Sequence, residues 1–226
     1  MDMCWQLSIR LMHAPYPTLL PVGYCEQETV HFRQLLASEA AMPAPTAAPP
    51  SISEDEYLAG EAVSEVKHEF IGGQVYAMTG ASRRHGLIAS ALIFALTPAA
   101  RSKKCQLFAA DMKLRLEVGG ETIFYYPDVM ASCDPADRDP YVTRNPCLII
   151  EILSESTARI DRREKLLAYQ TIPSLQSYLL VEQERRHVEL YRRATGWQAE
   201  RYNDGVLPME CLDTSLSLDD IYADVA

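Results

Sequence analysis

The segment Cys147-Leu148-Ile149-Ile150-Glu151-Ile152-Leu153 places one carboxylate in the middle of an otherwise apolar run. A continuous apolar run of this length predicts a β-strand that is buried on both faces of its sheet. A carboxylate inside such a strand is costly to bury unless it is paired or binds a cation. The run therefore predicts a central strand of a covered sheet and marks Glu151 as a candidate functional residue.

A second acidic residue follows an apolar run upstream, in Tyr125-Tyr126-Pro127-Asp128-Val129, and a charged segment with Asp161 and Lys165 follows Glu151. Magnesium prefers oxygen ligands and usually keeps several waters, so two or three carboxylates are enough to bind it. Phosphodiester hydrolysis uses such a cation to activate water, and a lysine can stabilise the developing charge. Two carboxylates on neighbouring strands, with a lysine nearby, thus indicate a magnesium site for phosphodiester cleavage.

Composition and charge are consistent with this interpretation. The chain has 226 residues, of which 48% are hydrophobic and 23% charged, as expected for one soluble globular domain with a sizeable core. No apolar stretch is long and charge-free enough to predict a transmembrane helix. The formal net charge of −10 argues against a protein that coats nucleic acid. It is compatible with a nuclease, because bound cations offset the charge of acidic metal ligands.

The N-terminal part differs from the rest of the chain. Residues 1–41 show no clear period, and Met42 opens the proline-rich stretch Met-Pro-Ala-Pro-Thr-Ala-Ala-Pro-Pro. The N-terminus lacks the features of a secretory signal. We expect residues 1–50 to be a disordered or non-native extension, with Met42 as an alternative start, and residues 51–226 to form the folded domain.

Sequence patterns predict the order of the main elements. Ser53 with Glu56 predicts a capped helix over 54–60, and Gly72-Gly73 predicts a hairpin within 69–78. The segment 85–101 predicts a buried helix that Pro98 kinks or ends. Further predictions are strands at 106–118, 121–132, 147–153, 177–181, 187–192 and 197–202, a helix capped by Ser156-Thr157 that runs to about 170, and a last helical turn at 218–223. This order is typical of a mixed α/β fold with a central sheet.

The cysteines show no pairing in sequence. Six of them are scattered along the chain without a CxxC motif: Cys4, Cys25, Cys105, Cys133, Cys147 and Cys211. This spacing argues against a structural zinc site and predicts reduced thiols in a cytoplasmic protein.

The ordered motifs resemble those of a known family. Three motifs, in this order along the chain, resemble those of the Uma-two family of restriction endonucleases, in the PD-(D/E)XK nuclease superfamily. They are Tyr126-Pro127-Asp128-Val129, residues 150–157 with the sequence Ile-Glu-Ile-Leu-Ser-Glu-Ser-Thr, and residues 161–165 with the sequence Asp-Arg-Arg-Glu-Lys. The upstream segment Glu69-Phe70-Ile71-Gly72-Gly73 resembles the opening hairpin of that family. The resemblance spans about residues 53–222 and implies a restriction-endonuclease-like α/β core, in which a central mixed sheet is flanked by helices.

The resemblance also implies roles for individual residues. Asp128 and Glu151 would bind Mg²⁺, with Mn²⁺ as a substitute, and Glu69 would assist. The superfamily lysine, expected two residues after Glu151, is replaced by Leu153, which points to Lys165 as its substitute. In a helix Asp161, Lys165 and Tyr169 share one face, so the geometry permits this exchange.

Each candidate also has a structural explanation. Asp128 can cap a turn, Glu151 can form a purely structural ion pair, and Lys165 can be solvated or paired with Asp161. Glu69 can simply begin a strand. Two weaker candidates are Asp111, which fits a strand bulge, and His85, which can meet a phosphate at a helix start or serve as a capping or packing residue.

The sequence therefore predicts a cytoplasmic, magnesium-dependent endodeoxyribonuclease with Asp128, Glu151 and Lys165 as catalytic residues. Its partner would be DNA, held by weak non-specific contacts from some of the scattered basic pairs. Exposed strands after Val181 make a homodimer plausible, and two sites would suit cleavage of both strands. The alternatives are a catalytically silent nucleic-acid-binding or protein-interaction module on the same fold, and hydrolysis of RNA or a small phosphodiester.

Overall fold

The centre of the molecule is a mixed six-stranded sheet, seen in a computed structural model that describes residues 51–154 and 158–225. Its strand order is β11-β10-β9-β8-β6-β3, and only the β8–β9 pair is parallel. The strands are β3 (Gln106–Ala109), β6 (Val129–Ser132), β8 (Leu148–Leu153), β9 (Ser177–Glu182), β10 (Val188–Arg192) and β11 (Ala199–Tyr202).

A second sheet of five strands has the order β2-β1-β5-β4-β7. It contains β1 (His68–Ile71), β2 (Gln74–Ala77), β4 (Lys113–Val118), β5 (Glu121–Tyr125) and the short β7 (Val142–Thr143). A two-stranded sheet pairs β12 (Val206–Met209) with β13 (Thr214–Ser217).

The helices are α2 (Glu54–Glu61), α3 (Arg83–Lys103), α4 (Ala158–Ile160), α5 (Leu166–Gln170) and α6 (Leu218–Ile221). A π-helical turn, η1 (Asp161–Lys165), joins α4 to α5, and two 3₁₀ turns are η2 (Arg193–Thr195) and η3 (Glu210–Leu212). This architecture confirms the predicted mixed α/β fold.

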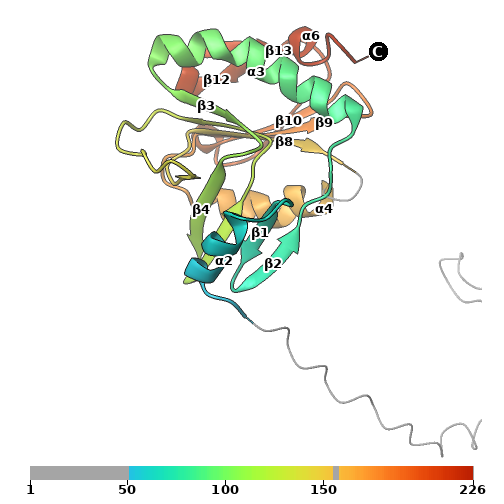
Figure 1. Ribbon diagram of the computed structural model, residues 1–226. Helices are drawn as coiled ribbons and strands as arrows, with labels where there is room; N and C mark the ends of the chain where they lie inside the picture. The colour runs from blue at the N-terminus through green and yellow to red at the C-terminus, as the bar shows by residue number, and fades with distance from the viewer. Residues whose placement is uncertain (1–50, 155–157, 226) are drawn as a thin grey trace, which may run out of the picture. The chain divides into compact units, whose positions relative to one another are not determined.

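The six-stranded sheet is covered on both faces (Figure 1). On one face, α3, α6 and the β12–β13 pair close a core that includes Leu92 and Ile150. On the other face, α5 and strands of the second sheet close a core that includes Ile149 and Tyr169. The prediction of a strand covered on both sides is confirmed, because all six residues of β8 are buried.

Strand alternation decides which way Glu151 points. Successive side chains of a strand project to opposite faces. Leu148, Ile150 and Ile152 belong to the core under α3, whereas Ile149 and Leu153 belong to the core under α5. Glu151 therefore projects between the central sheet and the η1–α5 segment.

The predicted N-terminal elements are confirmed. Ser53 and Glu56 form a complete capping box at the start of α2. β1 and β2 form the expected hairpin, in which Gly72 and Gly73 have φ of 54° and 91°. These positive φ angles are accessible to glycine at little cost.

The prediction that Pro98 ends the helix is wrong, whereas a kink at Pro98 stays a prediction. Helix α3 runs through Pro98 to Lys103, and its buried face is confined to Ile88, Leu92, Leu96 and Ala100. Phe94, on another side of the helix, is 84% exposed. The long apolar stripe against the sheet outweighs the local cost of the proline, so the helix continues.

Two predictions fall on residues that the structure does not describe. These are the N-terminal extension over residues 1–50 and the cap formed by Ser156-Thr157. Both stay predictions. None of the helices within 51–154 and 158–225 has the length and apolar character needed to cross a membrane.

The prediction of reduced, unpaired thiols is wrong for four cysteines. Cys105 is joined to Cys133, and Cys147 to Cys211, by disulfide bonds. The pairs are 28 and 64 residues apart in sequence, so short-range spacing could not reveal them.

Replacing Pro98 by alanine is expected to stabilise the protein. A proline inside a helix lacks a backbone donor and costs about 3 kcal/mol relative to alanine. We expect Pro98→Ala to raise the free energy of unfolding by about 1–3 kcal/mol in urea denaturation. Pro140→Ala, in an exposed bend of the 134–146 loop, is the control and should bring no gain. An unchanged or lowered stability of Pro98→Ala would contradict this account of α3.

Candidate active site

Asp128 and Glu151 lie on neighbouring strands. Val129, the first residue of β6, pairs with Ile150 of β8, which brings the preceding Asp128 beside Glu151. The Asp128 amide approaches Glu151 Oε2 at 3.4 Å, and Asp128 Oδ2 accepts a hydrogen bond of 2.7 Å from the Ile152 amide. The backbone of the strand pair thus holds both carboxylates in place.

Lys165 points into this site. Its Nζ lies 3.0 Å from Glu69 Oε1, 3.2 Å from Glu151 Oε1 and 3.4 Å from Asp161 Oδ1. The lysine is 6% exposed, which excludes the alternative of a solvated side chain. One ammonium group therefore joins three carboxylates that come from β1, β8 and η1.

Two tyrosine side chains also contact the Lys165–Glu151 pair. The Tyr169 hydroxyl donates a hydrogen bond of 2.8 Å to Glu151 Oε1, and the Lys165 Nζ lies 5.1 Å from the centre of the Tyr125 ring. Such placement over an aromatic face is favourable for a cation. Asp161, Lys165 and Tyr169 all meet at the site, as their shared helical face predicted.

Burial and charge shift the titration of the central pair. Burial raises the pKa of Glu151 to about 8, against the opposing effect of Lys165. Burial disfavours the Lys165 ammonium, but Glu151, Glu69 and Asp161 outweigh it and hold the pKa of Lys165 well above its usual value. The lysine is therefore charged at neutral pH, and its charge reduces the cost of ionising the buried carboxyl of Glu151.

His85 belongs to the site, which the sequence indicated only weakly. It lies in the first turn of α3, and its Nε2 is 3.1 Å from Asp128 Oδ2. The hydrogen bond to Asp128 raises the pKa of His85, although burial opposes the rise. Sequence reasoning offered a phosphate contact or a capping role for this residue, and the structure instead places it against a candidate metal ligand.

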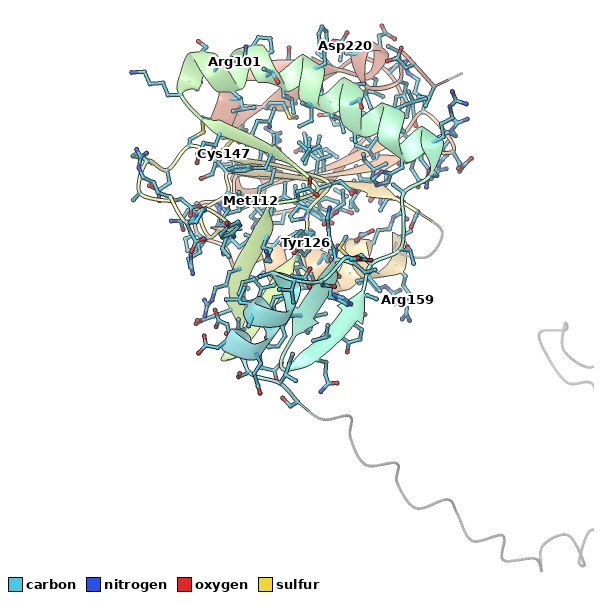
Figure 2. The ribbon with its side chains drawn as sticks, viewed as in Figure 1. Arg101, Met112, Tyr126, Cys147, Arg159 and Asp220 are labelled. Carbon is cyan, nitrogen blue, oxygen red and sulfur yellow. A yellow bond between two sulfur atoms is a disulfide. The ribbon has the colours of Figure 1, made fainter. Side chains whose placement is uncertain are left out.

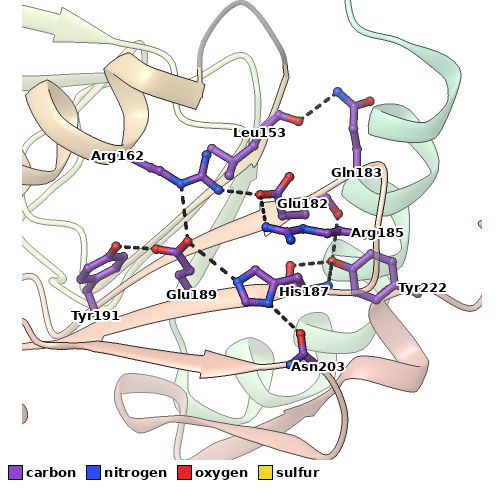
Figure 3. Close-up of polar contacts among 10 residues, drawn as sticks. All are labelled: Leu153, Arg162, Glu182, Gln183, Arg185, His187, Glu189, Tyr191, Asn203 and Tyr222. Atoms are coloured by element: carbon purple, nitrogen blue, oxygen red, sulfur yellow. Dashed lines mark hydrogen bonds and ion pairs between the residues drawn. The ribbon is translucent and has the colours of Figure 1, made fainter. Parts of the chain in front are cut away.

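A polar network fixes the segment that carries Lys165 (Figure 3). Arg162 of η1 lies 2.5 Å from Glu182 and 3.4 Å from Glu189. Glu189 also accepts a hydrogen bond of 2.6 Å from the Tyr191 hydroxyl. Arg162 thus anchors η1 to β9 and β10 and keeps Lys165 directed at Glu151.

Asp111 is not part of this group. Its side chain is 81% exposed and pairs with Lys67. Its neighbour Ala110 has a φ of 42°, so the backbone here is irregular, in agreement with the structural explanation.

The donor set fits a hard divalent cation. Among the described residues, the side-chain contacts of Asp128 fall on Oδ2, which leaves Oδ1 for a ligand bond, and Glu151 Oε2 contacts only an amide at 3.4 Å. Glu69, 17% exposed at its side chain, adds a third carboxylate. Oxygen ligands of this kind suit Mg²⁺ or Mn²⁺.

The mixed sheet, the two carboxylates on adjacent strands and the converging lysine define a restriction-endonuclease-like class of protein. Residues 54–220 match the model of the Uma2 family, described as "Putative restriction endonuclease". The chain belongs to this family, so the resemblance to the Uma-two family is confirmed.

Two relatives from Synechocystis sp. are similar over most of their length. "Uncharacterized protein slr1290" is 33% identical over 187 residues, which are 80% of this chain and 97% of the relative. "Uncharacterized protein sll1609" is 36% identical over 141 residues, which are 61% of this chain and 78% of the relative.

A solved structure shares the fold. It is the crystal structure of "a putative nuclease belonging to DUF820" from Anabaena variabilis, with a TM-score of 0.63 and 18% sequence identity. The match covers 76% of this chain and 98% of that chain. The likeness shows the restriction-endonuclease-like fold.

Removing the lysine is expected to destabilise the metal-free protein. Lys165→Met leaves buried carboxylates without their cation, and breaking a buried ion pair in this way costs about 3–5 kcal/mol. The measurement is urea denaturation with chelator at pH 8. Because the pKa of Glu151 is about 8, this carboxyl is protonated in both proteins at pH 6, and the wild type then no longer gains from its pair with Lys165. The loss should therefore shrink at pH 6.

Two variants serve as comparisons. Lys103→Met breaks an exposed pair with Asp213 and should leave the free energy of unfolding nearly unchanged, because solvent screens such a pair. Adding Glu151→Gln to Lys165→Met should restore part of the lost stability. Equal small losses in both lysine variants would contradict a buried, charge-compensating Lys165.

Proposed function

We propose that this protein is a divalent-metal-dependent endonuclease that hydrolyses DNA phosphodiester bonds. The observation that carries the proposal is the contact of the buried Lys165 ammonium with Glu151. The motif position that usually holds the superfamily lysine is Leu153 here, and Lys165 brings an ammonium to the same carboxylate from a helix. A lysine buried among carboxylates in this way would stabilise the negative charge of a phosphate that enters the site.

Asp128 and Glu151 would hold Mg²⁺, with Mn²⁺ as a substitute, and Glu69 would assist. An ion held by these residues would supply positive charge for a non-bridging phosphate oxygen and for lowering the pKa of a water. The positive charge of the ion would also stabilise the ionised form of Glu151, whose pKa is raised by burial. Binding of the metal would therefore release a proton from this site and become stronger as pH rises towards 8.

Lys165 would act as a hydrogen-bond donor and a fixed positive charge. Its raised pKa makes it a poor proton acceptor, so we assign it to orienting the attacking water and stabilising the charge on the pentacovalent phosphate. His85 is assigned a positioning role, because its contact with Asp128 Oδ2 orients that carboxylate.

DNA would be held through its phosphates. Arg159 and Arg163 are exposed and flank Asp161 on the α4–η1 segment, and the exposed Arg83 begins α3 two residues before His85. These arginines lie close in sequence to Lys165 and His85. Arg159 and Arg163 belong to the α4–η1 segment that carries Lys165, and Arg83 belongs to α3, which carries His85. Their contacts would position the phosphate backbone without reading bases.

One observation favours a second candidate, a catalytically silent binding module. Every carboxylate of the site already has a protein donor: His85 for Asp128, and Lys165 for Glu69 and Glu151. A silent module would keep these contacts and gain nothing from metal. The cleavage experiment separates the two.

Cleavage of supercoiled plasmid is the direct test of the nuclease. We expect nicking by the wild type with Mg²⁺ or Mn²⁺, none with chelator, and at least a hundredfold loss in Asp128→Asn, Glu151→Gln and Lys165→Met, because each removes a ligand or the fixed charge. Asp111→Asn, at an exposed carboxylate outside the site, is the matched control and should keep full activity.

Three outcomes would change the assignment. Activity that survives Lys165→Met would remove the lysine from the mechanism. Cleavage of RNA or of a chromogenic diester, but not of DNA, would redirect the substrate. A folded protein that cleaves none of these with either metal would favour the silent module.

Arginine variants test the DNA contact surface. In fluorescence anisotropy with duplex DNA and calcium, Arg159→Ala/Arg163→Ala should weaken binding and lower the slope of log K against log salt by about 2, since each phosphate contact contributes about 0.9. Arg101→Ala, an exposed residue in the last turn of α3, is the control (Figure 2). Equal effects of the double variant and the control would refute the assigned surface.

A further inference from the structure

Four cysteines from distant parts of the chain meet at one end of the central sheet. Cys105 directly precedes β3, Cys133 directly follows β6, Cys147 directly precedes β8, and Cys211 lies in η3. Because β6 and β8 are antiparallel, the end of one strand lies beside the start of the other. Cys147 is seen beside this sheet in Figure 2.

The two disulfides are themselves in contact. The Sγ atoms of Cys133 and Cys147, which belong to different disulfides, are 3.5 Å apart. The Sγ atoms of Cys133, Cys147 and Cys211 all lie within 4.8 Å of one another. Cys105 joins this group through its bond to Cys133. Three sulfurs therefore form a cluster, and the fourth, that of Cys105, is bonded to one of its members.

The dimensions of the cluster suit one tetrahedral ion. Zinc is bound by four thiolates at about 2.3 Å, which places the sulfurs about 3.8 Å apart. The contact of 3.5 Å between Cys133 and Cys147 is close to that spacing, and reduction of the two disulfides would let the bonded sulfurs move apart towards it. Soft thiolate ligands select zinc over magnesium, so this cluster is chemically distinct from the carboxylate site.

The surroundings of the cluster also support a structural ion. Cys147 is buried, Cys105 and Cys211 are half-buried, and Cys133 is exposed and provides access for a metal or a reductant. Lys104 directly precedes Cys105, and its charge would offset part of that of a four-thiolate site. The absence of a CxxC motif does not oppose such a site, since the sheet brings the ligands together.

We propose that the reduced protein binds one zinc ion through Cys105, Cys133, Cys147 and Cys211, and that the zinc-bound and two-disulfide forms are alternative states. Two equivalents of a dithiol reductant supply four electrons and four protons, which convert the two disulfides into four thiols. Zinc binding then releases four protons as the thiolates coordinate.

The ion would fix η3 and the adjoining β12–β13 pair to the central sheet. It would also hold together the ends of β6 and β8 that lie opposite Asp128 and Glu151. Asp128 and Cys133 flank β6 and are five residues apart, so about 17 Å of extended strand separates the two sites. The inference rests on the cysteine cluster alone and does not depend on the proposed nuclease activity.

Metal analysis of the full chain tests the proposal. The protein is reduced with a phosphine, incubated with zinc, freed of excess metal and analysed by elemental mass spectrometry. We expect one zinc per wild-type chain and less than a fifth of that in Cys133→Ser and Cys147→Ser. Cys4→Ser/Cys25→Ser, which alters the two cysteines that are not among the proposed ligands, should keep full zinc content.

Cobalt substitution of the wild type gives a test that does not depend on folding of the variants. Tetrahedral thiolate ligation predicts intense visible bands and a sulfur-to-cobalt charge-transfer band, both lost when an oxidant restores the disulfides. Absence of zinc and of these bands in the reduced, folded wild type would overturn the proposal. Full zinc retention by Cys133→Ser, or a sulfide-containing iron chromophore in place of zinc, would overturn it as well.

Discussion

The burial of Glu151 is the constraint on which the site depends. A carboxylate in a strand covered on both faces needs positive charge or hydrogen-bond donors, and the alternation of β8 directs it away from α3 towards α5. Lys165 and Tyr169 meet this need from one helical segment. Because Lys165 also contacts Glu69 and Asp161, the same ammonium ties the second sheet to the first.

The rest of the architecture can be understood as support for this arrangement. Arg162 fixes the π-helical turn to β9 and β10, and the turn directs Lys165 inward. Helix α3 covers the opposite face of the sheet, and its first turn brings His85 to Asp128. The ordinary elements of a mixed α/β fold thus deliver side chains from four separate segments to one carboxylate pair.

Much of this fold and site could be predicted from local patterns. The apolar run around Glu151, the Gly72-Gly73 turn and the capping box at Ser53 are short-range signals, and each is confirmed. The placement of His85 depends on how α3 crosses the sheet, and the disulfides depend on strand pairing, so neither has a local signal. The helix does not end at Pro98, as one of the two predicted outcomes required, because packing of the whole helix outweighs one residue.

The central claim is that Asp128 and Glu151 form a cation site completed by Lys165. Anomalous diffraction from crystals grown with Mn²⁺ tests it most directly. The account predicts one manganese peak within about 2.3 Å of an oxygen of each carboxylate, with the Lys165 ammonium still directed at Glu151. No peak between these two residues at saturating Mn²⁺, or a peak at a different set of ligands alone, would contradict it.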